Sequence, residues 1–248
     1  MSKVAFITGA SSGFGASIAK RLDNDGYSVI ICARRKEKLQ ELAKILKNQC
    51  LVLELDVRDK NAVFNAVNNL KNEWANIDIL VNNAGLALGQ EKTPEASLDE
   101  FEIMIDTNIK GLIYVTKALL GRLNKGAIIF NLGSVAGQWP YPGGHVYGAS
   151  KAFVHQFSFN LRNDLQGRDI RVSVIAPGIA KTEFSDVRFR GDKKRANAVY
   201  DGTKYLSADD IAMVVSDIAK LPKHVNINYI ELMPVTQSWA GFSFEREL

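Results

Sequence analysis

Short, nearly uninterrupted apolar runs alternate along this chain with longer amphipathic stretches, and this alternation limits the fold more than any other feature of the sequence. Because the runs are continuous rather than polar at every second position, the strands that they form should be covered on both faces. Strands of this kind that alternate with helices are typical of a doubly wound α/β fold. We therefore predict a parallel sheet of seven strands with helices on both faces. The predicted strands are residues 4–8, 28–33, 50–55, 77–81, 127–132, 171–176 and 227–232. The predicted helices are residues 13–25, 37–48, 60–74, 98–123, 150–165 and 208–220.

Length and composition are those of an ordinary globular protein. The 248 residues suit one large domain, residues 1–248, although two smaller domains would also fit the length. The net charge is only +4 and the basic residues are scattered, so we do not expect nucleic acid as a partner. No apolar run reaches the length of a membrane span or of a signal peptide, so we expect no membrane partner and a cytoplasmic location. Cys32 and Cys50 lack metal or redox spacing and are expected to be buried.

A glycine-rich loop follows the first predicted strand and opens the first predicted helix. Glycines lack a Cβ, so the backbone can turn sharply and approach a pyrophosphate closely, while the helix N-terminus supplies N–H groups. The spacing departs from G-x-G-x-x-G by one residue, but the strand–turn–helix context predicts a Rossmann-type dinucleotide site. A purely structural turn is the alternative. The predicted loop contacts to the cofactor are Thr8, Gly9, Ser11, Ser12, Gly13, Phe14 and Gly15.

The end of the second strand indicates which dinucleotide is bound. Folds that prefer NAD place an acidic residue about 20 residues beyond the loop, to hold the ribose 2′-hydroxyl. This chain has Arg34 and Arg35 there instead. A guanidinium can bind a phosphate with two hydrogen bonds, so we predict NADP as the cofactor, with two solvated arginines as the alternative. Asp56 ends the third strand and would accept the adenine amino group or, equally well, cap a helix.

Three polar side chains around residues 133–151 are the candidate catalytic groups. Ser134 follows a predicted strand, and Tyr147 and Lys151 are four residues apart where a helix should begin, so they share one face. A phenol has a pKa of about 10, and a nearby ammonium should lower this pKa and so suit Tyr147 for proton transfer to or from a carbonyl or alcohol oxygen. Chance is the alternative, because Tyr200 and Lys204 repeat the spacing. The serine and the helix beside the first copy favour function.

Together these motifs resemble the short-chain dehydrogenase/reductase family over essentially the whole chain, as do Asn82-Asn-Ala-Gly85 and Pro177-Gly178. The resemblance implies a catalytic tetrad of Asn108, Ser134, Tyr147 and Lys151. In that scheme Tyr147 exchanges the proton, Ser134 hydrogen-bonds the substrate oxygen, Lys151 holds the nicotinamide ribose, and Asn108 positions a proton-relay water. The further cofactor contacts that it implies are Val57, Asn83, Ala84, Gly85, Tyr147, Lys151, Pro177, Gly178 and Thr182.

Four stretches outside these motifs are similar to a narrower group, the NADP-dependent 3-hydroxy acid dehydrogenases, which are also described as L-allo-threonine or serine dehydrogenases and malonic semialdehyde reductases. The stretches are residues 83–89, 138–144, 182–191 and 233–241. The similarity implies NADP-linked oxidation of the 3-hydroxyl of a small acid such as L-serine, L-allo-threonine or 3-hydroxypropionate, or reduction of the corresponding semialdehyde. A 3-oxoacyl-[acyl-carrier-protein] reductase would share every catalytic residue and is the alternative. A dinucleotide-sensing regulator would have lost the tetrad.

A small acid carries a carboxylate, and binding it away from water requires a cation or several donors. Arg188 and Arg190 are the candidates, because they lie in residues 178–204, a segment outside the strand–helix alternation that we expect to close over the substrate. A solvated or structural role is the alternative. Gln138, with Ser134 and Tyr147, completes the predicted substrate contacts. No metal is expected, because the three histidines lack the spacing of a metal site.

The predicted helix at residues 150–165 carries more apolar surface than one face needs, including Phe153, Phe157 and Phe159. We expect part of it to contact a second subunit, and the family resemblance implies a homotetramer. The apolar tail with Trp239, Phe242 and Phe244 is expected to reach a neighbouring subunit or its active site. Core packing is the alternative for both features.

Overall fold

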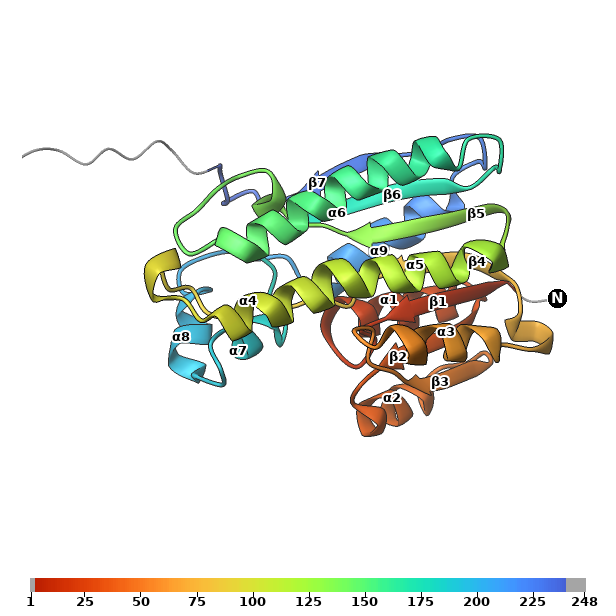
Figure 1. Cartoon of the computed structure of the whole chain (residues 1–248), viewed down its shortest axis with the longest axis horizontal. Helices are drawn as coiled ribbons and strands as arrows, with labels where there is room; N and C mark the ends of the chain where they lie inside the picture. The colour runs from red at the N-terminus through yellow and green to blue at the C-terminus, as the bar shows by residue number, and fades with distance from the viewer. Residues whose placement is uncertain (1–2, 240–248) are drawn as a thin grey trace, which may run out of the picture.

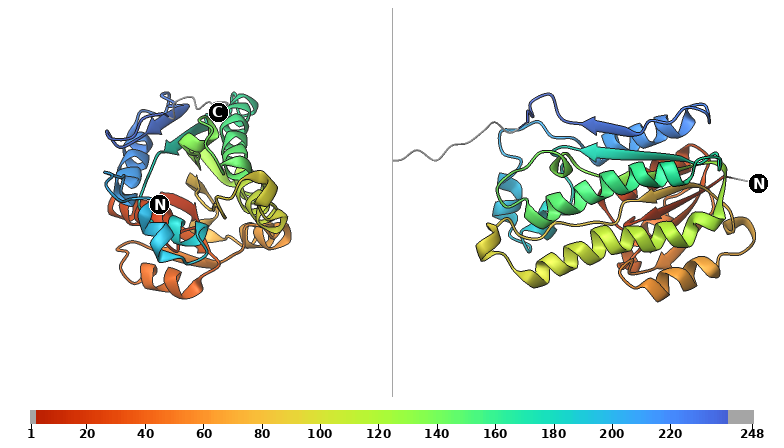
Figure 2. Two further views of the ribbon diagram at one scale, coloured as in Figure 1. Left: turned by 90° about the vertical axis from the view of Figure 1, so that its left-hand side faces the viewer. Right: turned by 45° about the horizontal axis from the view of Figure 1, so that its top comes forward.

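The computed structural model describes residues 3–239, which form one parallel sheet of seven strands between two layers of helices (Figures 1 and 2). The strand order is β3-β2-β1-β4-β5-β6-β7, and every neighbouring pair is parallel, as predicted. The strands are β1 (Val4–Thr8), β2 (Ser28–Ala33), β3 (Cys50–Glu54), β4 (Ile77–Asn82), β5 (Leu123–Leu132), β6 (Arg171–Pro177) and β7 (Tyr229–Leu232). The helices are α1 (Gly13–Asn24), α2 (Lys36–Ala43), α3 (Lys60–Asn68), α4 (Leu98–Ile105), α5 (Leu112–Leu119), α6 (His145–Asp164), α7 (Phe184–Arg188), α8 (Lys193–Ala198) and α9 (Ala208–Lys220).

Each face of the sheet has its own hydrophobic core. Successive residues of a strand point to opposite faces, so Ile7 of β1 packs with α1, α2 and α9, while its neighbour Phe6 packs with α3, α5 and α6. Both side chains are completely buried. Burial on both faces explains why the strands appear in the sequence as continuous apolar runs. Within residues 3–239, no helix has both the length and the apolar character that crossing a membrane requires.

Several predicted helix ends are wrong, including that of the helix predicted at residues 60–74, which ends at Asn68. The helix predicted to reach residue 48 stops at Ala43, because the Asp23 carboxylate accepts hydrogen bonds from the backbone N–H groups of Lys47 and Asn48 at 2.9 and 2.8 Å and holds them in a turn. The helix predicted at residues 150–165 starts earlier, at His145. The prediction for Cys50 is also wrong, because its side chain is only partly buried.

The long helix predicted at residues 98–123 is interrupted. Between α4 and α5 the chain forms a π-helical turn, Asp106–Gly111, which includes Asn108. Single π-helical turns inside α-helices occur often at functional sites. The predicted irregular segment, residues 178–204, contains the short helices α7 and α8, and both lie beyond the carboxyl ends of the strands (Figure 1). Phe242 and Phe244 lie outside the described residues.

Buried amides join the centre of the sheet to the helices on one face. The side-chain Nδ2 of Asn82 donates to Thr116 Oγ1 of α5 at 2.9 Å and to Asn131 Oδ1 of β5 at 2.8 Å. Asn131 Nδ2 in turn donates to Ser158 Oγ of α6 at 2.8 Å. Asn131 is fully buried. A buried polar group that loses its partner costs more free energy than the hydrogen bond itself contributes, so this network fixes α5 and α6 on the sheet.

We predict that Asn131→Val lowers the free energy of unfolding by about 1–3 kcal/mol, because it leaves an N–H group of Asn82 buried without an acceptor. Urea unfolding followed by circular dichroism measures the change. Asn65→Val, at an exposed position of α3, is the matched control and should change stability by less than about 0.5 kcal/mol. Equal effects of the two substitutions would contradict the proposed role of the network.

Candidate active site

A cleft of about 850 Å³ opens beyond the carboxyl ends of strands β1 to β6, which is where doubly wound sheets bind their ligands. We call one part, beyond β2 and β3, the Arg34 end, and the other, beyond β5 and β6, the Tyr147 end. The predicted site residues that line the cleft are Gly9, Ser11, Ser12, Gly13, Phe14, Arg34, Arg35, Asp56, Val57, Asn83, Ala84, Gly85, Ser134, Tyr147, Lys151, Pro177, Gly178, Thr182 and Arg188. Thr8, Gly15, Asn108 and Gln138 are not part of this lining.

Thr8 and Gly15 shape the glycine loop from behind. The Thr8 hydroxyl accepts from the backbone N–H groups of Asn83 and Ala84, both at 2.9 Å. The Asn83 amide donates to the carbonyls of Thr8 and Gly9 at 2.9 and 3.1 Å. A Cβ on Gly15 would lie 2.5 Å from both Asn83 Nδ2 and the Gly9 carbonyl oxygen, so only glycine permits this approach. The loop backbone is thereby left free to face the cleft.

At the Arg34 end, the charged residues that line the cleft are Arg34, Arg35, Asp56, Arg58 and Glu183. Arg35 donates to the hydroxyls of Ser11 and Ser12, at 3.0 and 2.7 Å, and forms an ion pair with Glu183 at 2.8 Å. Arg34 makes no hydrogen bond or ion pair with any residue in the described range 3–239. Asp56 pairs with Arg58 at 2.6 Å, and the hydrogen bond from Arg58 lowers the pKa of its carboxyl group.

The alternative role for Asp56, capping of helix α3, is wrong. Asp59 caps that helix, since its carboxylate accepts from the backbone N–H of Ala62 at 2.9 Å. Asp56 thus remains at the cleft with its side chain next to the end of β3.

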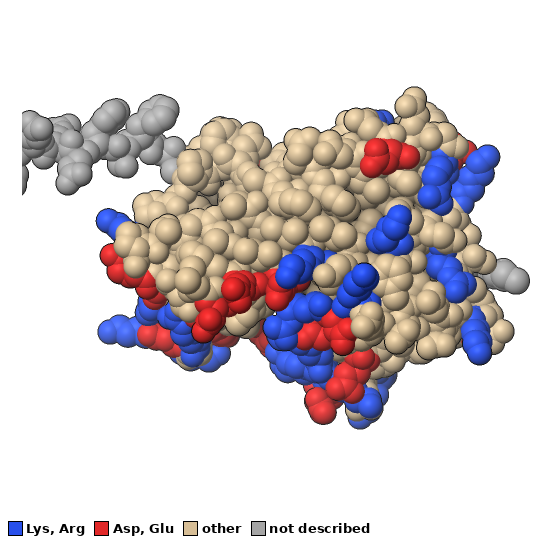
Figure 3. Space-filling view, viewed as in Figure 1, with Lys and Arg blue, Asp and Glu red and all other residues tan. Residues whose placement is uncertain are grey.

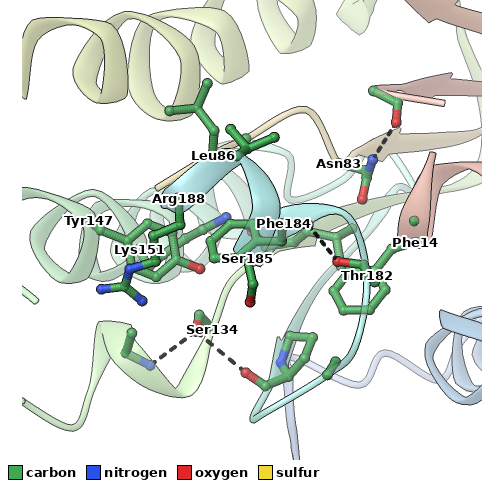
Figure 4. Close-up of a pocket in the computed structure, with 18 of the residues that line it drawn as sticks. Phe14, Asn83, Leu86, Ser134, Tyr147, Lys151, Thr182, Phe184, Ser185 and Arg188 are labelled. Atoms are coloured by element: carbon green, nitrogen blue, oxygen red, sulfur yellow. Dashed lines mark hydrogen bonds between the residues drawn. The ribbon is translucent and has the colours of Figure 1, made fainter. Parts of the chain in front are cut away.

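At the Tyr147 end, the predicted catalytic side chains converge (Figure 4). Because α6 begins at His145, Tyr147 and Lys151 lie one helical turn apart on the same face, with Lys151 Nζ 5.8 Å from the centre of the phenol ring. Lys151 Nζ donates to the carbonyl of Leu132, the last residue of β5, at 2.7 Å. Ser134 lies just beyond the same strand, where its hydroxyl accepts from the Ala136 N–H at 3.1 Å.

Burial controls the protonation of this pair. Burial raises the pKa of Tyr147 to about 12, although the Ser134 hydroxyl and the Arg188 guanidinium act in the opposite direction. Burial lowers the pKa of Lys151 to about 8. The sequence predicted that Lys151 lowers the pKa of Tyr147. In the structure this pKa is raised instead. The Lys151 ammonium is directed at the Leu132 carbonyl, and desolvation of the phenolate outweighs the attraction of nearby cations.

Asn108 lies behind the cleft wall rather than in it. Its Nδ2 donates to the Leu86 carbonyl at 2.8 Å and to Ser150 Oγ at 3.0 Å, and its Oδ1 accepts from the Leu86 N–H at 2.9 Å. A Cβ on Gly85 would come within 3.2 Å of Asn108 Oδ1 and 3.4 Å of Lys151 Nζ, so Gly85 lies between the two side chains. Asn108 therefore ties the segment after β4 to α6, and its role with a relay water stays a prediction.

Only one of the two candidate arginines enters the cleft. Arg188 donates to the Gly89 carbonyl and to the Tyr141 hydroxyl, both at 3.0 Å, and its guanidinium lies 6.0 Å from the centre of the Tyr147 ring (Figure 4). Arg190 does not line the cleft, because it pairs with Glu100 at 2.6 Å on the exposed side of the segment. The structure therefore removes Arg190 from the candidates for a substrate anion.

Gln138 is not brought together with the catalytic side chains. Its amide oxygen accepts from the Tyr229 hydroxyl at 3.3 Å, on β7, and it lines a separate, shallower depression with Lys92 and Pro94. The predicted contact between Gln138 and the substrate has no support in this arrangement, because Gln138 does not line the cleft.

The second Tyr–Lys pair has a structural role. The Tyr200 hydroxyl hydrogen-bonds the Ser185 hydroxyl at 2.6 Å and donates to the Ala180 carbonyl at 3.2 Å, which fastens α7 to the loop after β6. The sequence did not indicate the aromatic side chains that surround Tyr147. These are Tyr141 and Phe184, and the Phe184 ring lies 5.5 Å from the phenol. Both lie in loops or short helices without a periodic pattern, so nothing in the sequence alone indicated which way they point.

A glycine loop under a crevice in a parallel sheet, with a buried serine, tyrosine and lysine at its other end, defines a dinucleotide-dependent oxidoreductase site. Residues 3–193 match the family model for short chain dehydrogenases, and the chain belongs to this family. The family resemblance predicted from the sequence is confirmed.

Particular relatives are similar over the whole length. The chain is 50% identical over 248 residues, 98% of this chain and 100% of the relative, to the NADP-dependent 3-hydroxy acid dehydrogenase YdfG of Escherichia coli (strain K12). It is also 50% identical to sulfoacetaldehyde reductase 2 of Chromohalobacter salexigens, with 100% of both chains covered. Among solved structures, the closed form of serine dehydrogenase complexed with NADP+ matches with a TM-score of 0.95 and 48% identity, over 98% of this chain and 100% of that chain.

Proposed function

We propose that this protein transfers a hydride between NADP(H) and the 3-hydroxyl or 3-oxo group of a small 3-hydroxy acid. L-Serine, L-allo-threonine and the pair 3-hydroxypropionate and malonic semialdehyde are the substrates to test. One observation carries the proposal: the Arg188 guanidinium lies 6.0 Å from the Tyr147 ring in the same cleft as the glycine loop. A cation this close to the proton-transferring group fits an anion only a few bonds from the reacting carbon.

The residues at the Arg34 end fit NADP. Gly9 and Gly15 let the loop pack against Asn83, because a Cβ on either would collide with it, and the loop backbone at the N-terminus of α1 would then receive the pyrophosphate. Arg34 has no partner among residues 3–239 and is available for the 2′-phosphate, with Arg35 beside it. One full-length relative is named as NADP-dependent, and the similar serine dehydrogenase structure is a complex with NADP+. NADPH supplies the hydride when it is bound, and the chain's own residues hold and protonate the substrate.

In the proposed mechanism, the substrate oxygen sits between Ser134 and Tyr147, at the buried end of the cleft. Ser134 Oγ donates a hydrogen bond to the carbonyl oxygen, and the Tyr147 hydroxyl donates the proton in the direction of reduction. A phenol with a pKa near 12 is fully protonated at neutral pH and so is ready as an acid. Lys151 and Arg188 are the nearby cations that compensate the phenolate left behind. Asn108 keeps the wall behind Lys151 in place.

The assembly and location remain proposals as well. We propose one domain over residues 1–248, a cytoplasmic location and a homotetramer. The surface over α6 supports an interface, because few charged side chains gather there, while the elements below it carry many (Figure 3). Phe153 and Phe157 stack along α6 with ring centres 5.7 Å apart, and Phe159 is partly exposed.

We predict opposite pH profiles for the two directions of the reaction. Reduction needs a proton from the Tyr147–Lys151 pair, so kcat/KM for reduction should fall as the pair loses its first proton above about pH 8. Oxidation needs the pair to accept a proton, so its kcat/KM should rise to a plateau over the same range. Tyr147→Phe should abolish both rates while NADPH binding, followed by fluorescence, stays nearly unchanged. Profiles that are flat through about pH 8, or a substantial residual rate in this variant, would assign the proton to another group.

We predict that Arg188→Ala raises KM for 3-hydroxypropionate about ten- to a hundredfold, because it removes a charge-assisted hydrogen bond to the substrate anion. An uncharged alcohol of similar length, 1,3-propanediol, should be affected much less, because it has no anion to lose. Arg190→Ala is the matched control, since its guanidinium pairs with Glu100 outside the cleft. An unchanged KM in Arg188→Ala would remove Arg188 from the substrate site.

A sulfonate is the second candidate anion. Sulfoacetaldehyde and malonic semialdehyde both place one CH₂ group between the aldehyde and the anion, a guanidinium binds either group, and a full-length relative at 50% identity is a sulfoacetaldehyde reductase. A 3-oxoacyl thioester lacks this anion and would leave Arg188 without an anionic partner.

A substrate panel tests the proposed function. We expect oxidation of 3-hydroxypropionate, L-serine and L-allo-threonine with NADP+ in preference to NAD+, measured as the appearance of NADPH. Isethionate tests the sulfonate, and reduction of a 3-oxoacyl thioester with NADPH tests the alternative reductase. Activity confined to the thioester would overturn the proposal.

A further inference from the structure

Glu183 joins two parts of the chain that are far apart in the sequence. It lies between the loop after β6 and helix α7, and its two carboxylate oxygens accept from Arg35 Nη1 at 2.8 Å and from Lys38 Nζ at 2.9 Å. Arg35 follows β2, and Lys38 lies in the first turns of α2. The ion pairs thus cross the Arg34 end of the cleft, whose lining includes both Glu183 and Arg35.

The two cations are arranged around the carboxylate as they would be around a phosphate. Arg35 is oriented from behind by the glycine loop, because its other N–H groups donate to the hydroxyls of Ser11 and Ser12. The hydrogen bonds from Lys38 and Arg35 lower the pKa of Glu183 to about 2, so it is an anion at any working pH. The side chains of Arg35, Lys38 and Glu183 are 45%, 44% and 39% exposed, so a ligand can reach all three.

We propose that Glu183 occupies the site of the NADP 2′-phosphate in the free enzyme, where it binds Arg35 and Lys38. When NADP binds, the phosphate displaces Glu183 and binds both cations. Lys38 is then a phosphate ligand beside Arg34 and Arg35, and Glu183 helps to set the cofactor preference. The inference rests on the 2′-phosphate site of the proposed function.

Charge is the reason why the two anions exchange rather than share the site. A 2′-phosphate carries more negative charge than a carboxylate and offers more acceptor oxygens, so it binds the guanidinium and ammonium more strongly. The carboxylate and the phosphate repel each other at hydrogen-bond distance from the same cations. NAD has no 2′-phosphate, so it gains nothing from displacing Glu183, and the exchange affects NADP alone.

The test is calorimetric binding of NADP+ and NAD+ to the full chain without substrate, so it does not depend on which hydroxy acid the enzyme uses. We expect Glu183→Gln to bind NADP+ about three- to tenfold more tightly, because the amide holds the cations weakly and does not repel the phosphate. Its Kd for NAD+ should change less than about twofold. Glu54→Gln is the matched control: Glu54 pairs with Lys36 at 3.5 Å and lies outside the cleft lining, so it removes the same charge without touching Arg35 or Lys38.

Lys38 is tested in both backgrounds. Lys38→Gln should leave NAD+ binding unchanged and weaken NADP+ binding by about three- to tenfold in Glu183→Gln. The weakening should be smaller in the wild-type chain, because the substitution there also removes the ion pair with Glu183 that NADP+ has to break. An effect that disappears in Glu183→Gln would show that Lys38 holds only Glu183, and would overturn its assignment as a phosphate ligand. Unchanged or weaker NADP+ binding in Glu183→Gln would overturn the displacement.

Arg34→Ala separates these failures from a failure of the cofactor site itself. If Arg34→Ala weakens NADP+ binding but Glu183→Gln has no effect, the 2′-phosphate site stands and the displacement is wrong. If Arg34→Ala also leaves NADP+ binding unchanged, the 2′-phosphate lies elsewhere and both proposals fall.

Discussion

The cleft depends on the close approach of the glycine loop to the end of β4. In the strand order, β1 pairs with β2 on one side and with β4 on the other, so the chain leaves β1 at the point where the connections switch direction. Thr8 and Asn83 bridge this point with hydrogen bonds to each other's backbone, and Gly15 allows the loop to pass against the Asn83 amide. A larger residue at position 15 would push the loop away from the sheet. The crevice is therefore a direct result of backbone geometry, and the chemistry at its walls is added by side chains.

The Tyr147 end owes its character to burial rather than to a simple charge pair. Removing a phenol and an ammonium from water disfavours the charged form of each, which moves the pKa of Tyr147 up and that of Lys151 down. The two pKa values therefore move apart and their order reverses, from 10.0 for the phenol and 10.5 for the ammonium to about 12 and about 8, so the lysine loses its proton first. The Leu132 carbonyl is the hydrogen-bond acceptor for Lys151, and the Ser134 hydroxyl and the Arg188 guanidinium lie near the phenol. A ligand that enters the site and stabilises the phenolate therefore lowers the pKa of Tyr147, because it offsets part of the large desolvation cost.

The sequence predicted the sheet and the glycine loop because short-range rules decide both. Strands buried on two faces must be apolar throughout, and a loop position where a Cβ would lie 2.5 Å from a neighbouring amide must be glycine. It could not decide between Arg188 and Arg190, which are two residues apart; only the packing of α7 against Tyr141 and Gly89 shows that Arg188 enters the cleft. It failed for Gln138 for the same reason, and it misjudged the pKa of Tyr147 because burial is a property of the folded chain. Helix ends were wrong where a distant carboxylate, such as Asp23, competes for the backbone.

The segment from Thr182 to Arg188 contributes to both ends of the cleft. Glu183 lies just before α7 and contacts the cations at the Arg34 end. Arg188 is the last residue of α7 and lies beside Tyr147. Both proposed ligands, the 2′-phosphate and the substrate anion, carry negative charge, and each meets an arginine whose position depends on this five-residue helix. Tyr200 hydrogen-bonds Ser185 within this helix and the Ala180 carbonyl, so the segment that carries both contacts is tied to the loop after β6 and is not a free loop.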